Sequence, residues 1–126
     1  MLGDNILYTA LNVTDITDLL DSFGSGKALF SAKLLPTSFT GNKSINYYMS
    51  GVFNGALEYG RYLYSINCRS NDFHESKEIA VAVKDEINRN NYTNSFITVS
   101  ILETIPPMDD TDVYNTPVEA TIKGGN

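Results

Sequence analysis

The sequence holds few side chains whose types and spacing could support catalysis. Its single histidine, His74, and its single cysteine, Cys68, stand apart from any nucleophile or zinc signature. We expect His74 to lie exposed in the first turn of a helix, and Cys68 to be a buried, inert thiol. Glu58 could work as acid or base with Glu78 or Glu103, but no spacing rule brings these carboxylates together. No catalytic residue is predicted.

Two further segments resemble ligand sites in part. The string Asp109-Asp110-Thr111-Asp112 is acidic enough for calcium or magnesium, but it lacks the glycine and distal glutamate of an EF-hand loop. A solvated acidic turn is the favoured interpretation. Gly24-Ser25-Gly26-Lys27 resembles a phosphate-binding loop, yet Ala28 follows the lysine where that motif requires Ser or Thr. We therefore predict no metal site, no cofactor and no cofactor-binding residue.

Composition indicates one folded, acidic domain over residues 1–126. The chain is 42% hydrophobic and 19% charged, which is typical of globular proteins rather than disordered ones. Its net charge is −6, and its Lys and Arg residues form no run, so direct nucleic-acid binding is not expected. With one cysteine, no signal peptide and no apolar stretch of about 20 residues, the sequence predicts a cytoplasmic protein, or one built into a particle there, with no membrane contact.

The elements that would position these residues follow from hydrophobic periodicity. Residues 5–11 and 16–20 show helical spacing, interrupted at Thr14-Asp15, a cap pair. Glycines at 24 and 26 end the helical structure, residues 28–35 form an apolar strand ended by Pro36, and residues 37–43 are a polar loop. A broken N-terminal helix and a first strand are therefore expected.

Four further segments carry strand signatures. Residues 44–53, 62–69 and 95–105 alternate apolar and polar side chains, as half-buried strands do. Residues 113–122 form a last strand, which we place at an edge of the sheet because Pro117 cannot donate a ladder hydrogen bond.

The long central helix spans residues 73 to about 89 and begins at a recognisable cap. Asp72 is the N-cap, and Glu75 completes a pair like the capping box. One apolar stripe must pack against the sheet; it comprises Ser76, Ile79, Ala80, Val83 and Ile87. The fold class is thus α+β: a mostly antiparallel sheet of four to five strands, with an N-terminal helix and this helix on one face.

The strand, turn and capped helix at residues 62–89 resemble the core of the small tail-completion proteins of long-tailed bacteriophages. The order of elements around it matches over nearly the whole chain, including the strand ended by Pro36 and the acidic turn that holds Tyr114. The resemblance implies a tail terminator, a structural protein and not an enzyme. Such a subunit forms a hexameric ring that caps the tail tube and presents the surface on which the filled head docks.

The resemblance also implies partners and a location. The implied partners are further copies of the chain, the tail tube protein and head-completion proteins. The implied location is the neck region of a virion that is assembled in the host cytoplasm. DNA would pass through the channel of the ring without specific binding. Two alternatives stay open. One is a head-completion or neck protein of the same particle, and the other is a small cytoplasmic α+β enzyme or ligand-binding module.

Within that hypothesis, two loops are candidates for contacts with other subunits or with the tube. The interface candidates are Thr37, Ser38, Phe39, Asn42, Lys43, Asp109, Asp110, Asp112, Tyr114 and Asn115. Because the subunit is acidic and DNA must pass the ring, we expect a channel lined by acidic and small polar side chains. The acidic candidates for the lumen are Glu58, Asp109, Asp110, Asp112 and Glu119.

Overall fold

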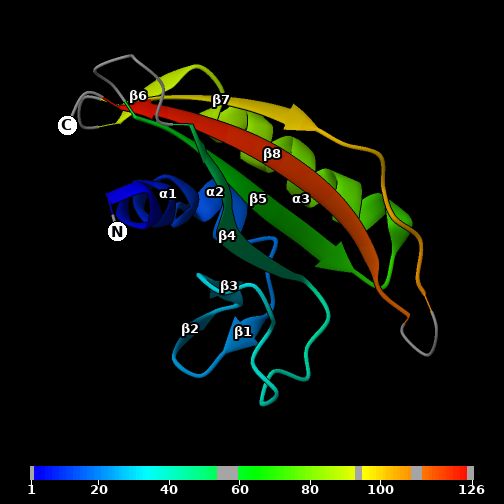
Figure 1. Cartoon of the computed structure of the whole chain (residues 1–126). Coiled ribbons are helices and arrows are strands. Elements are labelled where there is room, and N and C mark those ends of the chain that lie inside the picture. The colour runs from blue at the N-terminus through cyan, green and yellow to red at the C-terminus, as the bar shows by residue number, and fades with distance from the viewer. Residues whose placement is uncertain (1, 54–59, 93–94, 109–111, 125–126) are drawn as a thin grey trace.

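The structure, a computed structural model, describes residues 2–53, 60–92, 95–108 and 112–124. A curved sheet carries helices on one face, and a short hairpin lies beside the sheet (Figure 1). In chain order the elements are α1 (Leu2–Leu11), α2 (Thr14–Thr17), β1 (Ser22–Phe23), β2 (Gly26–Lys27), β3 (Leu29–Phe30), β4 (Ser44–Phe53), β5 (Gly60–Ser70), α3 (Phe73–Ile87), β6 (Asn90–Tyr92), β7 (Ser95–Ile101) and β8 (Tyr114–Gly124). Within the described ranges, no helix combines the length and the apolar character that a membrane crossing needs.

The main sheet has the strand order β3-β4-β5-β8-β7-β6. Its four long strands, β4, β5, β8 and β7, pair antiparallel with their neighbours, while the two-residue β3 runs parallel to β4. The predicted α+β class and the mostly antiparallel sheet are confirmed. The sequence predicts four to five strands, and the described sheet has six, because the short strands β3 and β6 extend its two edges.

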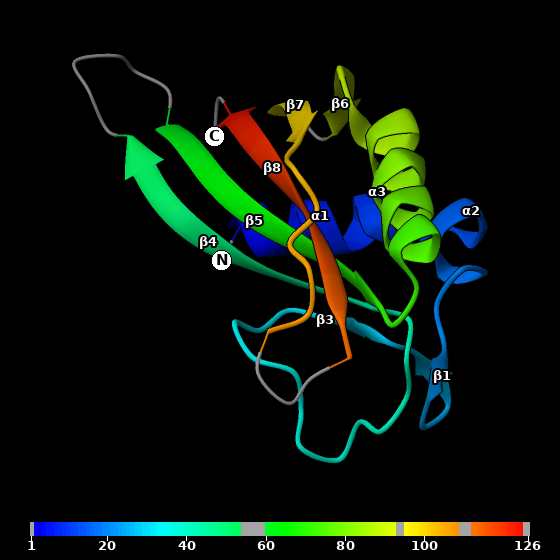
Figure 2. The ribbon, with the colours of Figure 1, turned by 90° about the vertical axis from the view of Figure 1, so that its right-hand side faces the viewer.

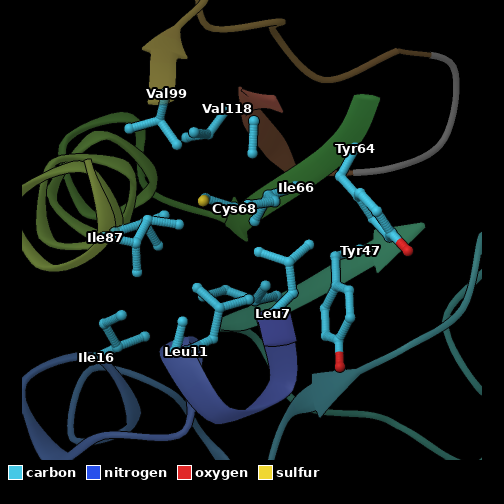
Figure 3. Close-up of a cluster of buried hydrophobic side chains, with 14 of the residues drawn as sticks. Leu7, Leu11, Ile16, Tyr47, Tyr64, Ile66, Cys68, Ile87, Val99 and Val118 are labelled. Atoms are coloured by element: carbon cyan, nitrogen blue, oxygen red, sulfur yellow. The ribbon is translucent and has the colours of Figure 1, made fainter. Parts of the chain in front are cut away.

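One hydrophobic core lies between the sheet and the helices. Side chains of α1, α2 and α3 meet the inner faces of β4, β5, β8 and β7 in a single cluster, so the helices cover the same face (Figure 3). On α3 the buried residues are those of the predicted stripe: Ser76, Ile79, Ala80, Val83 and Ile87. Cys68 is fully buried in this cluster, as expected. The opposite face of the sheet has no helix over it in the described structure, and we call it the open face.

The cap of α3 is built slightly differently from the prediction. The Asp72 carboxylate accepts a hydrogen bond from the His74 amide, as an N-cap should. Glu75 does not reach back to the Asp72 amide. The Ser70 hydroxyl lies between them: it accepts from that amide at 3.1 Å and donates to the Glu75 carboxylate at 2.8 Å. The helix start is therefore fixed by a side chain from the end of β5.

The expected edge position of the last strand is wrong, because β8 lies in the middle of the sheet between β5 and β7. Pro117 is tolerated there for a geometric reason. Its carbonyl accepts from the Leu102 amide, beyond the last residue of β7, and the N and C=O of one strand residue point to the same side. The missing N–H therefore faces Leu102, just past the end of β7, so the proline costs the sheet only the last bond of that ladder.

Two of the expected strands are shorter than predicted. Only Leu29 and Phe30 of the expected strand at 28–35 pair with β4, because the Asn46 side-chain amide binds the carbonyls of Ala32 and Lys33 and turns the chain away. The predicted strand at 95–105 ends at Ile101, followed by an isolated bridge at Ile105.

The helix termini differ as well. The N-cap of α2 is Val13, which makes no side-chain cap bond, rather than Thr14 or Asp15. Helix α3 ends at Ile87, two residues earlier than expected, and Arg89 takes a left-handed φ of 61° that turns the chain into β6. The Phe23–Lys27 segment, expected only to end the helices, forms the β1–β2 hairpin with the turn at Gly24, φ 59°.

Candidate interaction surface

The two predicted interface loops lie at the same end of the sheet. Lys43 precedes Ser44, which pairs with Arg69, and Ser70 pairs with Tyr114 at the start of β8. Figure 2 shows the segment between β3 and β4 and the entry into β8 together at the lower end of the molecule. Residues far apart in the sequence thus form one surface, which we call the loop end.

Backbone contacts anchor the 37–43 loop to the rest of the domain. The Asp21 carboxylate accepts hydrogen bonds from the amides of Asn42 and Lys43, and the Asp21 amide donates to the Lys43 carbonyl at 2.9 Å. The Asn42 side chain in turn accepts from the Asn71 amide, between β5 and α3. These bonds hold the loop in one shape, and they leave the Asn42 and Lys43 side chains half-buried.

Phe39 belongs to a small aromatic cluster and is half-buried. Its ring packs edge to face with the rings of Phe23 and Phe30, with centroid distances of 6.0 and 5.6 Å. A Cβ atom added at Gly41 would lie 2.7 Å from the Phe39 ring, so any larger residue would collide with it. Of the predicted contacts in this loop, Thr37 and Ser38 are exposed, and Phe39, Asn42 and Lys43 are half-buried.

The second loop is also partly tied to the core. Tyr114 packs edge to face on Phe73 at the start of α3, with a centroid distance of 5.9 Å. The Asn115 amide donates to the Ile105 carbonyl at 3.0 Å, and its side-chain amide donates to Asn67 at 3.0 Å. Asp112 is exposed, whereas Asp109 and Asp110 lie outside the described residues.

Of the acidic lumen candidates, the structure describes Asp112 and Glu119. Glu58 falls outside the described residues, in the connection between β4 and β5. That connection leaves from Phe53, which pairs with Arg61 at the end of the sheet opposite the loop end. Asp112 lies at the loop end, about 30 Å away by the length of β5. Glu119 is exposed in the middle of the open face, between Ser65 and Ser100 on the two neighbouring strands.

A polar network covers the open face near the loop end. The Asn46 side-chain oxygen accepts from Arg69 Nε at 2.9 Å, and Asn46 and Asn67 pair across β4 and β5 while both stay buried. Burial lowers the pKa of the Arg69 guanidinium from its ordinary value. The side-chain oxygen of Asn115 and the hydroxyl of Ser44 are buried without a hydrogen-bond partner in the structure. This network stiffens the strands that carry both loops.

Groups with chemical reactivity are dispersed. His74 is exposed at the first turn of α3, as predicted. Burial raises the pKa of the Cys68 thiol far above its usual range, so the nucleophilic thiolate is disfavoured. In the part of the chain that the structure describes, no three His, Cys, Asp or Glu side chains gather as metal ligands would.

Sequence reasoning missed a set of exposed apolar residues at the sheet edges. A hollow of about 480 Å³ lies between α3 and the chain leaving β7; its lining residues are Phe73, Lys77, Ile101, Leu102, Glu103 and Thr104. Leu102 and Phe73 are 46% and 39% exposed, and Leu34 on the opposite edge is 78% exposed. The sequence did contain an indication of this exposure: the alternation of side chains along the strand places Leu102 on its outward side.

No protein-family model matches the chain, and no curated protein matches it in sequence. Among solved structures, the fold is similar to that of a chain in the virion of a native gene transfer agent particle, with a TM-score of 0.62 and 13% sequence identity. The match covers 96% of this chain and 94% of that chain. At this identity the similarity establishes a shared fold that extends over nearly all of both chains.

Proposed function

We propose that this protein is a structural subunit of a phage-type virion. In this role it forms a ring at the head-proximal end of a tail tube, ends the polymerisation of the tube and provides the surface for head joining. The observation that carries the proposal is the fold shared, almost end to end, with a chain of a gene transfer agent virion. A fold alone hosts many functions, so the surface must support the same conclusion.

The loop end supports a docking role because hydrogen bonds hold its described residues in place before any partner arrives. The bonds from Asp21 hold the 37–43 loop, and the bond from Asn115 to Asn67 holds the start of β8. A surface that is already in its bound shape loses less conformational entropy on association. The exposed side chains there, Thr37, Ser38 and Asp112, are the candidates for contacts with the tube protein or with head-completion proteins.

The proposed location is the tail neck of the virion, after assembly in the host cytoplasm, with DNA passing through the ring without specific binding. Six copies of the 13.9 kDa chain would form a ring of about 83 kDa. Mass photometry of the purified chain, alone and with tail tubes of the same particle, should show this discrete species. A protein that stays monomeric under both conditions would contradict the proposal and favour a ligand-binding module or enzyme.

Deleting the gene from its particle separates the proposal from the neck-protein alternative. Loss of a tail terminator should give tubes of uncontrolled length, visible by electron microscopy, because nothing ends polymerisation. Loss of a head-completion protein should instead leave tails of normal length that fail to join heads. Complementation with the intact chain is the control, and it should restore joined particles with tails of uniform length.

A further inference from the structure

The two long edges of the sheet carry different and complementary groups. On the β4 edge, the segment after β3 presents Lys33 and Leu34, both exposed. On the β7 edge, the chain that leaves the strand presents Leu102 and Glu103, both exposed. Each edge therefore offers one apolar side chain beside one charge, and the charges are opposite in sign.

Both apolar side chains are held by the fold rather than by mobile chain. The Asn46 side-chain amide donates to the carbonyls of Ala32 and Lys33, both at 3.1 Å, and so fixes the backbone just before Leu34. The Leu102 amide donates to the Pro117 carbonyl at 2.9 Å. An exposed leucine on fixed backbone costs little entropy when a partner covers it, and covering it removes apolar area from water.

The Lys33–Leu34 segment and Leu102 also lie at the same level along the strands. Asn46 pairs with Asn67, and Asn67 pairs with Pro117, whose carbonyl binds Leu102. This single row of residues crosses β4, β5 and β8 and ends at the β7 edge. The Lys33 ammonium lies 6.0 Å from the centroid of the Tyr48 ring, on the open face, and Leu102 shares the outward parity of Ser100. Lys33 on one edge and Leu102 on the other thus belong to the same side of the sheet.

The direction of the strands permits copies to stand side by side. Three successive antiparallel pairings make β4 and β7 run in opposite directions. A second copy in the same orientation would therefore bring its β4 edge antiparallel to the β7 edge of the first. In the described structure no strand pairs with β4 beyond Asn46 on that side, or with β7 beyond Ile97, although the Asn88 side chain accepts from the Val99 amide at 2.8 Å.

We propose that copies of this chain associate head to tail, with Leu34 of one copy packed against Leu102 of the next and Lys33 facing Glu103. This rests on the proposed ring and names the surface that forms it. The contact is heterologous, so each copy uses one edge to bind and offers the other, which is the arrangement that closes into a ring. The hollow beside Leu102, between Phe73 and Thr104, gives the incoming edge room to settle.

Disulfide trapping tests this contact in the full chain. The variant carrying both Leu34→Cys and Leu102→Cys, oxidised with copper phenanthroline, should give a ladder of linked multimers up to the ring on a non-reducing gel. Each single variant should stay monomeric on that gel, and an equal mixture of the two should stop at dimers. A Leu34→Cys variant that dimerises alone would overturn the proposal, because it would show a two-fold contact of like edges.

A matched control uses Val81→Cys in place of Leu102→Cys, because Val81 is 45% exposed on the outer side of α3 and should give no ladder with Leu34→Cys. Mass photometry of the unoxidised double variant completes the test. Rings without a ladder would overturn this contact while leaving the proposed function in place. A ladder without any closed ring would overturn the ring while leaving the contact, and monomers in both measurements would overturn both.

Discussion

The hydroxyls of Ser76 and Thr116 lie 2.9 Å apart in the core and join α3 to β8. Thr116 also lies 2.8 Å from the hydroxyl of Thr104, so one buried threonine connects the helix, its strand and the chain that follows β7. Both Ser76 and Thr116 are fully buried.

Thr116→Val should lower the free energy of unfolding by about 1–3 kcal/mol, because it leaves a buried hydroxyl on Ser76 with one partner fewer. Urea denaturation measures the change. Thr121→Val, on the open face of the same strand, is the matched control and should change stability by less than about 0.5 kcal/mol. Equal effects of the two changes would show that the hydroxyl contact contributes little.

Val83→Asp should abolish cooperative folding. Val83 lies fully buried on the inner stripe of α3, and an unpaired carboxylate there costs several kcal/mol against a total stability of roughly 5–15 kcal/mol. Circular dichroism melts and solubility report the outcome. Val81→Asp is the control two residues away, on the exposed side of the helix, and should melt like the parent chain. A folded Val83→Asp protein would contradict the assignment of the buried face.

The helix and the long strands were predictable because local pattern and burial agree in them. The α3 stripe, the bounds of β4 and the inner side of β5 follow from periodicity alone. The position of β8 did not follow, because Pro117 argues for an edge unless one knows that β7 ends at Ile101. Whether a strand tolerates a proline depends on the strand beside it, and the order of strands in a sheet cannot be derived from local sequence.

The candidate surface was predictable only in outline. The sequence indicated both loops of the loop end, but not that Phe39 packs on Phe23 and Phe30 or that Asp21 binds the loop across 21 residues. Contacts of that range depend on the tertiary fold. The pairing of Leu34 with Leu102 across the width of the sheet depends on strand order in the same way.

Asp21→Ala should loosen the 37–43 loop while leaving the sheet intact. The change removes the acceptor of the Asn42 and Lys43 amides, and hydrogen bonds to a charged group contribute about 1.5–3 kcal/mol. Hydrogen exchange at these two amides should rise by about tenfold or more, while amides of β5 keep their protection. Asp18→Ala, at an exposed residue nearby, is the control. Unchanged exchange at both amides would show that the carboxylate does not hold the loop.

Cys68 should make the folded protein lose stability at high pH. Burial raises the pKa of its thiol, so above about pH 8.5 the unfolded chain releases this proton while the native state keeps it. The contribution of the protonated thiol to the free energy of unfolding is present below that pH, and it falls by about 2 kcal/mol between pH 8 and 10. Urea denaturation at several pH values measures it, with Cys68→Ala as the reference that lacks this dependence. Parallel curves for the two proteins would contradict a buried thiol.

Of the two acidic lumen candidates that the structure describes, Glu119 lies on the open face and Asp112 at the loop end. Glu119 stands between Ser65 and Ser100 on the neighbouring strands. One carboxylate flanked by small polar side chains repels phosphate and does not bind it, as a passage for DNA requires. At the end of the sheet opposite Asp112, the basic residues Arg61 and Lys123 pair across β5 and β8. We therefore predict that the part of the open face around Glu119 faces the channel.

Glu119→Lys should leave ring mass and stability unchanged but reduce DNA delivery by assembled particles several-fold. A basic side chain in the channel would bind phosphates through counterion release and slow the transit of DNA. Glu78→Lys, on the exposed side of α3, carries the same charge change and should leave delivery unchanged, because the helices would face away from the channel. The two measurements are mass photometry of the ring and transfer of a marker gene. Equal delivery by both variants, or a ring structure whose channel wall is formed by Lys33, Lys43, Arg61 or Arg69, would refute the acidic lining.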